Sequence, residues 1–205
     1  MSGLFERLSA LFEQGHRAKI DDLLDDHRFD LAQRTADAAV LIAVTDRPKD
    51  AGGPGIILTQ RPTGMRDHPG QVAFPGGKQD DGEDAIAAAL REAEEELDLD
   101  RRHVRLIGIS DRYRTGTGFN ITPVLGVVPA DLNLTPHPRE VEAWFEVPMA
   151  HVFSHSNWTE HEVFWNGSMR KYLEMHYQGF RIWGVTAAII SNLSRRIDVR
   201  ELLDG

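Results

Sequence analysis

Three carboxylates near the end of a predicted helix are the residues in this sequence best suited to chemistry. Glu92, Glu95 and Glu96 lie in the stretch Ala89–Leu99, ALREAEEELDL. At 100° per residue, Glu96 lies about 40° to one side of Glu92 and Glu95 about 60° to the other, so all three share one face. Carboxylates are disfavoured there, because the C-terminal end of a helix is partially negative and like charges four residues apart repel.

This acidic arc has two interpretations. A solvated acidic face is the simpler one, but it would normally interleave Lys or Arg, and only Arg91 stands within reach of Glu95. A site for hard divalent cations explains the placement better, because carboxylate oxygens are the usual ligands of such ions. A cation also interacts favourably with a helix C-terminus. We therefore predict that the arc binds metal.

The elements that must position the arc follow from hydrophobic periodicity. The acidic helix is predicted over residues 83–97, and further helices are predicted over 3–30 and 181–197. Residues 63–84 have the composition of a loop, and a late hairpin is expected around Asn166-Gly167. Short branched apolar runs predict strands at 38–46, 55–61, 104–110, 121–129 and 141–148. This mixed order indicates an α/β or α+β fold with helices against a sheet. Residues 1–37 are expected to form an N-terminal helical extension and 38–205 the domain.

Composition limits the classes of function. The chain has 205 residues, of which 41% are hydrophobic, as expected for a globular domain. The absence of cysteine excludes disulfides and thiolate metal sites. A net charge of −9 argues against nucleic acid as a partner, and no apolar run is long enough to span a membrane. We expect a cytoplasmic protein; a homodimer is compatible with the sequence, which does not fix the oligomeric state.

The spacing around the acidic helix resembles the Nudix box, G-x5-E-x7-R-E-U-x-E-E-x-G-U, in which U is apolar. The matching residues are Gly77, Glu83, Arg91, Glu92, Ala93, Glu95, Glu96 and Leu99. The one departure is Asp98, which stands where the box has glycine. That glycine ends the helix in a left-handed conformation, which Asp is among the few residues to tolerate. We predict that Asp98 caps the helix in the same way.

The resemblance implies a Nudix fold, a mixed β-sheet sandwiched between helices, that hydrolyses a nucleoside diphosphate linked to another group. By position in the box, Glu92, Glu95 and Glu96 would be ligands of Mg²⁺ or Mn²⁺, and the carbonyl of Gly76 a further ligand. Arg91 would orient these carboxylates, which makes Arg91, Glu95 and Glu96 catalytic candidates. Glu83 would support the turn into the helix.

The segment before the box, Leu58–Gly77, reads LTQRPTGMRDHPGQVAFPGG. It resembles the signature of the coenzyme A pyrophosphatase subgroup, L-L-T-x-R-[S/A]-x3-R-x3-G-x3-F-P-G-G, with Ile57 for the first Leu and Pro62 for the small residue. The resemblance implies a CoA-type nucleotide as the small-molecule substrate. The substrate-binding candidates are Arg61, Arg66, Phe74, Gly77 and Lys78. Arginine is a rigid, permanently charged fork suited to phosphate.

Several assignments stay open at this point. Arg61 and Arg66 could instead be surface arginines paired with nearby carboxylates (Asp80, Asp81 or Glu83), and Phe74–Gly77 could serve only as a turn. A general base is often supplied from outside the box, and residues 138–148 offer Glu140, Glu142 and Glu146, of which we favour Glu140 or Glu142.

Three functions compete. The leading one is hydrolysis of CoA, or of an acyl or oxidised CoA, to 3′,5′-ADP and a 4′-phosphopantetheine product. A Nudix pyrophosphatase acting on ADP-ribose or a dinucleotide is the alternative within the class. A ligand-sensing domain without turnover is the alternative outside it, but such domains tend to lose box carboxylates and none is lost here.

Overall fold

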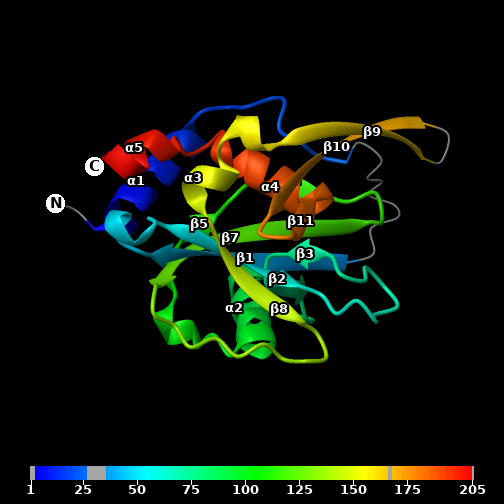
Figure 1. The fold of residues 1–205 in the computed structure, drawn as a ribbon, viewed down its shortest axis with the longest axis horizontal. Helices are drawn as coiled ribbons and strands as arrows, with labels where there is room; N and C mark the ends of the chain where they lie inside the picture. Colours follow the sequence, from blue (N-terminus) through cyan, green and yellow to red (C-terminus); the bar gives the residue numbers. More distant parts are fainter. Residues whose placement is uncertain (1–2, 27–35, 166–167, 205) are drawn as a thin grey trace.

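The computed structural model of the chain describes residues 3–26, 36–165 and 168–204. At its centre is a mixed eight-stranded sheet (Figure 1). Strands β1 (Ala36–Asp46) and β7 (Phe119–Pro129) lie parallel in the middle, paired from Ala36 with Phe119 to Asp46 with Pro129. The strands follow one another in the order β3-β2-β1-β7-β5, and in addition β4 pairs with β1, β6 with β7 and β8 with β2. Every pair other than β1–β7 is antiparallel. The remaining strands are β2 (Gly55–Gln60), β3 (Val72–Ala73), β4 (Gly76–Lys78), β5 (Arg105–Ile109), β6 (Tyr113–Arg114) and β8 (Ala143–Pro148).

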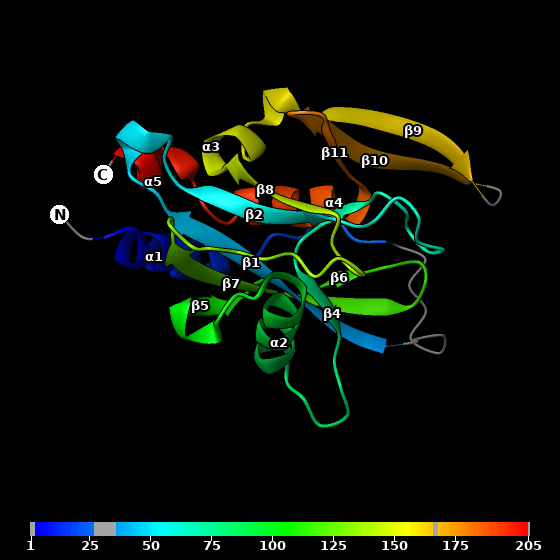
Figure 2. The same cartoon turned by 60° about the horizontal axis from the view of Figure 1, so that its bottom comes forward.

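Helices cover both faces of this sheet (Figure 2). Helix α2 (Ala85–Leu97) lies on one face, and α1 (Leu4–Arg17) and α4 (Gly184–Ser194) lie on the other. Strand β1 explains the two layers, because its side chains alternate: Leu41 packs in the core cluster of α2, and Ile42 in that of α1 and α4. A central strand buried on both faces reads as a continuous apolar run, as residues 38–44 do. The predicted fold, a mixed sheet between helices, is confirmed.

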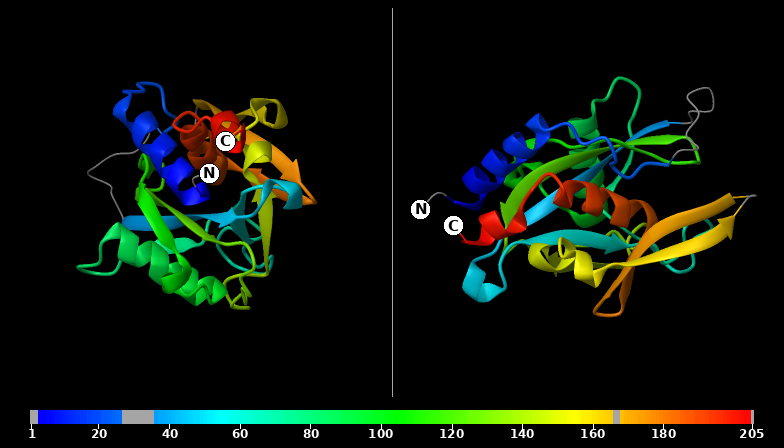
Figure 3. Two further views of the ribbon diagram at one scale, coloured as in Figure 1. Left: turned by 90° about the vertical axis from the view of Figure 1, so that its left-hand side faces the viewer. Right: turned by 90° about the horizontal axis from the view of Figure 1, so that it is seen from above.

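A smaller antiparallel sheet of three strands stands beside the main one (Figure 3). It consists of β9 (Thr159–Trp165), β10 (Ser168–Tyr177) and β11 (Phe180–Trp183). Pairing of Trp165 with Ser168 agrees with the predicted late hairpin, although its turn at 166–167 lies outside the described residues. Two short helices, α3 (Met149–Val152) and α5 (Val199–Asp204), and single 3-10 turns at Lys49–Ala51, Arg101–His103 and His155–Asn157 complete the described elements. None of the described helices has the length and apolar character needed to cross a membrane.

The N-terminal helix is shorter than predicted. It ends at Arg17, residues 18–26 are not helical, and the predicted part at 27–30 lies outside the described residues. Tertiary hydrogen bonds explain the difference: the buried Asn192 amide bonds both the N–H and the carbonyl of Leu24, and Arg196 donates to the carbonyls of Gly15 and Ala18. These contacts satisfy backbone groups that would otherwise continue the helix. The domain division at residue 37 stays a prediction, although α1 shares a core cluster with β1.

The predicted C-terminal helix, 181–197, is too long at both ends: α4 spans Gly184–Ser194, and residues 181–183 and 195–197 are not helical. Residues 181–183 belong to β11, where the buried Ile182 pairs with Met175 of β10. Gly184 follows with φ of 62°, a left-handed conformation that separates the strand from the helix. The segment predicted as a loop, 63–84, also contains the short strands β3 and β4, which the high glycine and proline content conceals.

Helix α2 ends as predicted at the residue that departs from the Nudix box. Asp98 has φ 56° and ψ 32°, and its N–H donates to the carbonyls of Ala93 and Glu94. The next residue, Leu99, is buried and donates to Ala93 as well, which completes a C-terminal motif usually built on glycine. The cap prediction for Asp98 is therefore confirmed.

We expect Asp98→Gly to be neutral or to stabilise the protein by up to about 1 kcal/mol, because glycine adopts this conformation without a steric penalty. Asp98→Ala should instead destabilise it, because alanine resists positive φ and offers no compensating polarity. Urea unfolding of the two variants beside the wild type measures both effects. Greater loss of stability in Asp98→Gly than in Asp98→Ala would contradict this account.

Candidate metal centre

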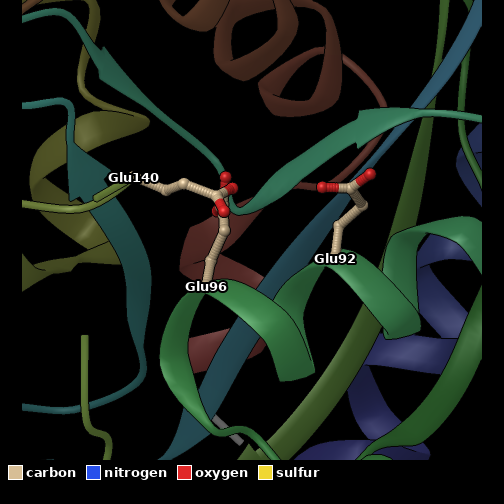
Figure 4. A group of neighbouring side chains, drawn as sticks. All are labelled: Glu92, Glu96 and Glu140. Atoms are coloured by element: carbon tan, nitrogen blue, oxygen red, sulfur yellow. The ribbon is translucent and has the colours of Figure 1, made fainter. Parts of the chain in front are cut away.

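The carboxylates of α2 lie on the face of the helix that meets the glycine turn before it. Glu92 and Glu96 are one helical turn apart and both point out of α2 in the same direction (Figure 4). The Glu96 residue is only 6% exposed, and the Glu92 side chain is 15% exposed. Helix α2 itself is fixed at its start by Asp84, whose side chain accepts the N–H of Ala87 at 2.8 Å.

A third carboxylate reaches the same place from a different part of the chain. Glu140 comes from the segment before β8, and ligand atoms of Glu92, Glu96 and Glu140 all lie within 4.8 Å of one another (Figure 4). Backbone hydrogen bonds hold this segment against the end of α2, since the N–H groups of Thr135 and His137 donate to the carbonyls of Leu97 and Glu96. We call these three side chains the carboxylate cluster.

Two glycines make room for the cluster. Gly76 has φ of 157°, and a Cβ there would lie 2.4 Å from the Ala39 carbonyl oxygen of β1. Its N–H donates to Glu96 at 3.3 Å. A Cβ on Gly77 would lie 2.5 Å from the carboxylate of Glu92, in space that the acid now occupies. The backbone of β4 therefore approaches the cluster as closely as it does because both residues lack side chains.

Arg91 ties the start of the box to its end. Its guanidinium donates to both oxygens of Glu83, at 3.0 and 2.9 Å, and to Glu92 at 2.9 Å and Glu95 at 3.0 Å. It also donates to the carbonyl of Lys78 at 3.0 Å. The carboxylate of Glu83 accepts the N–H of Asp80 as well, so it holds the turn ahead of α2. These hydrogen bonds raise the pKa of Arg91 further above its usual value, so it stays charged.

The cluster has more negative charge than its surroundings compensate. The pKa of Glu96 is raised to about 8, mainly by burial and to a lesser extent by the nearby charges of Glu92 and Glu140, while the Gly76 N–H and the charge of Arg61 act in the opposite direction. Burial also raises the pKa of Glu92, an effect that Arg91 partly offsets. Charges placed in such a site are costly unless they are paired or bind a metal.

These donors fit a hard divalent cation. All three are carboxylates, the ligand type of Mg²⁺ and Mn²⁺. Among the described residues, no histidine belongs to this group of possible ligands. The lack of a side chain at Gly77 lets the carboxylate of Glu92 lie against the β4 backbone, at the cluster.

The predicted site residues divide into two groups. Glu92, Glu96 and Gly76 meet at the cluster together with Glu140. Glu95 lies outside it: its side chain is 55% exposed and pairs with Arg91. Glu142 also lies outside, where its carboxylate accepts the N–H of Thr63 at 2.9 Å. The third acid that residues 138–148 offered as a base, Glu146, is bound by Arg47 and Thr45, which fixes it as a structural ion pair.

The candidate substrate contacts are also spread out. Phe74 is 3% exposed and packs in the core, so its side chain serves the turn. The amine of Lys78 lies 5.5 Å from the ring centre of Phe119. Arg61 and Arg66 have no ion pair recorded in the described part of the chain, and the Nε of Arg61 is buried without a hydrogen-bond partner. The nearby Glu83 and Asp80 pair with Arg91 instead, which removes two of the three partners considered for these arginines.

Sequence analysis did not single out His137, whose Nδ1 lies 3.8 Å from Glu140 and whose backbone N–H anchors the segment to Glu96. The sequence feature that could have indicated this contact is the spacing of three residues between His137 and Glu140. Such a spacing brings two side chains together where the chain makes a turn, as the hydrogen bond from the Glu140 N–H to the His137 carbonyl shows here.

Replacing Glu96 by Gln should leave the metal-free protein at least as stable as the wild type, because it removes a buried repulsive charge. Mn²⁺ should then raise the unfolding temperature of the wild type much more than that of Glu96→Gln, because a ligand that binds only the folded state stabilises it. Thermal unfolding in EDTA and in Mn²⁺ measures both. Equal metal-induced shifts in the two proteins would contradict the metal assignment. Glu94→Gln, on the other side of α2, is the matched control.

Comparison with known proteins agrees with this geometry. The NUDIX domain model matches residues 35–165, a range that includes the whole carboxylate cluster. NudL of Escherichia coli K12, an uncharacterized Nudix hydrolase, is 41% identical over 164 residues, which cover 80% of this chain and 83% of NudL. NudL of Shigella boydii serotype 4 is 40% identical over the same shares.

Solved structures with a similar fold include a Nudix hydrolase from M. smegmatis, RenU, at 24% identity and a TM-score of 0.48, covering 57% of this chain and 73% of RenU. A C. elegans Ap4A hydrolase has 21% identity and a TM-score of 0.47, covering 57% of this chain and 82% of that one. Because the family model spans well over half of the chain and two curated relatives exceed 30% identity, this chain belongs to the Nudix family.

Proposed function

We propose that this Nudix hydrolase cleaves the diphosphate bond of coenzyme A, or of an acyl or oxidised CoA, to give 3′,5′-ADP and a 4′-phosphopantetheine product. Mg²⁺ or Mn²⁺ is the proposed cofactor. Hydrolysis of a pyrophosphate-type substrate follows from the family, while the choice of CoA is our inference.

The observation that carries this choice is the state of two arginines in the loop between β2 and β3, one of which lies near the cluster. Arg61 lies near enough to Glu96 for its charge to lower the pKa of that acid, and its Nε is buried without a partner. Arg66 is exposed in the same loop. In a chain with net charge −9, two arginines without a recorded carboxylate partner are suited to bind an anion. They stand at the arginine positions of the CoA pyrophosphatase signature.

The residues of the site have separable roles in such a reaction. Glu92, Glu96 and Glu140 would hold a divalent metal, which would supply charge neutralisation at the diphosphate and activation of the attacking water. Arg91 fixes the orientation of Glu92 and Glu95 by hydrogen bonds to both. The Gly76 N–H holds one oxygen of Glu96. Arg61, whose Nε has no hydrogen-bond partner, would bind a phosphate oxygen through its guanidinium group. Glu140 remains our candidate for the general base, as an alternative to a role as metal ligand.

A cytoplasmic location and a homodimer are parts of the same proposal; cell fractionation and gel filtration test them.

A substrate panel with identification of the products tests the proposal. CoA should be hydrolysed with release of 3′,5′-ADP, in preference to ADP-ribose and to dinucleotides, when Mg²⁺ or Mn²⁺ is present. Glu96→Gln should lower kcat about 10²-fold or more, as for loss of a main charge-stabilising group. Release of AMP from ADP-ribose as the fastest reaction would assign a different Nudix substrate, and a folded wild type that turns over none of them would point to ligand sensing.

Arg61→Ala and Arg66→Ala test the substrate contacts. If either side chain binds a CoA phosphate, its removal should cost about 1.5–3 kcal/mol, the range for a charged hydrogen bond. That is a loss of about ten- to a hundredfold in kcat/KM on CoA. The loss should shrink on 3′-dephospho-CoA if the contact is to the 3′-phosphate, and stay the same if it is to the diphosphate. Full activity of both variants would show that neither arginine binds substrate.

A further inference from the structure

The loop that carries both arginines, residues 61–70, makes few hydrogen bonds to the rest of the described protein. We call it the arginine loop. Most of its recorded hydrogen bonds are internal, such as Gly70 N–H to Pro62 and Arg61 N–H to Gln71 at the base of the loop. Within the described residues, one recorded hydrogen bond joins residues 61–70 to a distant part of the sequence. It runs from the N–H of Thr63 to the carboxylate of Glu142, at 2.9 Å.

We propose that Glu142 is a positioning residue: its carboxylate holds the loop at Thr63, between Arg61 and Arg66, so that the loop, and Arg61 with it, keeps a fixed place relative to the carboxylate cluster. The side chain acts through the loop and does not touch the reacting atoms. The identity of the anion that the loop binds rests on the proposed function, whereas the attachment of the loop does not.

The backbone around Glu142 supports this role. Its own N–H donates to the carbonyl of Gln60, the last residue of β2, directly before the arginine loop. Two residues earlier, Glu140 belongs to the carboxylate cluster. The same short segment therefore presents one acid to the metal ligands of α2 and another to the arginine loop. This fixes the distance between the two halves of the site.

The competing role for Glu142 is that of general base. The two roles predict opposite results for Glu142→Gln, because glutamine keeps an oxygen that accepts the Thr63 N–H but cannot take up a proton. Glu142→Ala removes both abilities. Asp81→Ala is the matched control, since Asp81 is an exposed acid at a variable position of the turn before α2, with no side-chain hydrogen bond or ion pair among the described residues.

Steady-state kinetics of these variants, with the best substrate of the wild type, gives the first readout. Glu142→Ala should raise KM about three- to tenfold with kcat close to wild type, as for loss of one anchoring hydrogen bond. Glu142→Gln should restore KM, and Asp81→Ala should leave it unchanged. In the Arg61→Ala background, Glu142→Ala should raise KM by a smaller factor than it does in the wild type, because the Arg61 side chain that Glu142 helps to position is already absent.

Hydrogen exchange gives a second readout that needs no substrate. The amide of Thr63 should exchange faster in Glu142→Ala than in the wild type or Glu142→Gln. A fall in kcat of about 10²-fold or more in Glu142→Gln would overturn the proposal in favour of the general base. Unchanged KM and unchanged Thr63 exchange in Glu142→Ala would overturn it as well. If the best substrate is a diphosphate other than CoA, and the Glu142 variants still show the expected changes in KM and in Thr63 exchange, the proposed substrate is refuted and the role of Glu142 stands.

Discussion

The constraint on which the site depends is the presence of three carboxylates within 4.8 Å of one another, with Glu96 among them almost fully buried. Glu92 and Glu96 would be more stable in water, since burial and mutual repulsion both raise the free energy of their charged forms. The local architecture compensates for this cost in several ways. Arg91 is bonded to Glu92, the Gly76 N–H to Glu96, and two backbone hydrogen bonds hold the Glu140 segment against α2. A divalent cation would complete the compensation.

The glycine turn and the acidic helix act as one unit. β4 can approach α2 only because Gly76 and Gly77 lack side chains, and the space saved beside Gly77 is taken up by the carboxylate of Glu92. Arg91 then spans the unit from Glu83, before the helix, to Glu95, in its last turn. One guanidinium group thus joins four residues of the box segment: Lys78, Glu83, Glu92 and Glu95.

Much of this could be predicted from the sequence, because the controlling interactions are local. The face shared by Glu92 and Glu96, the cap at Asp98 and the alternation in β1 all follow from a helical or strand repeat. What could not be predicted depends on distant partners. Glu140 and Glu142 look alike in sequence, and only backbone bonds to α2 and β2 separate their roles. Residues 18–26 have a helical pattern but are held by Asn192 and Arg196, far along the chain. Ile182 is compatible with a helix or a strand, and its pairing with β10 decides for the strand.

The parallel pairing of β1 with β7 has a consequence for how the molecule folds. Parallel neighbours need a long crossover, and here the crossover between Asp46 and Phe119 contains the glycine turn, the arginine loop and the whole of α2. Closing so long a loop costs chain entropy before the pairing repays it, so such contacts form slowly. Glu92 and Glu96 become neighbours when α2 forms, but Glu140 lies beyond β7 and depends on contacts between distant parts of the chain. The third carboxylate therefore completes the cluster only where the long-range architecture is in place, so local unfolding of the segment before β8 would take the site apart while α2 stays intact.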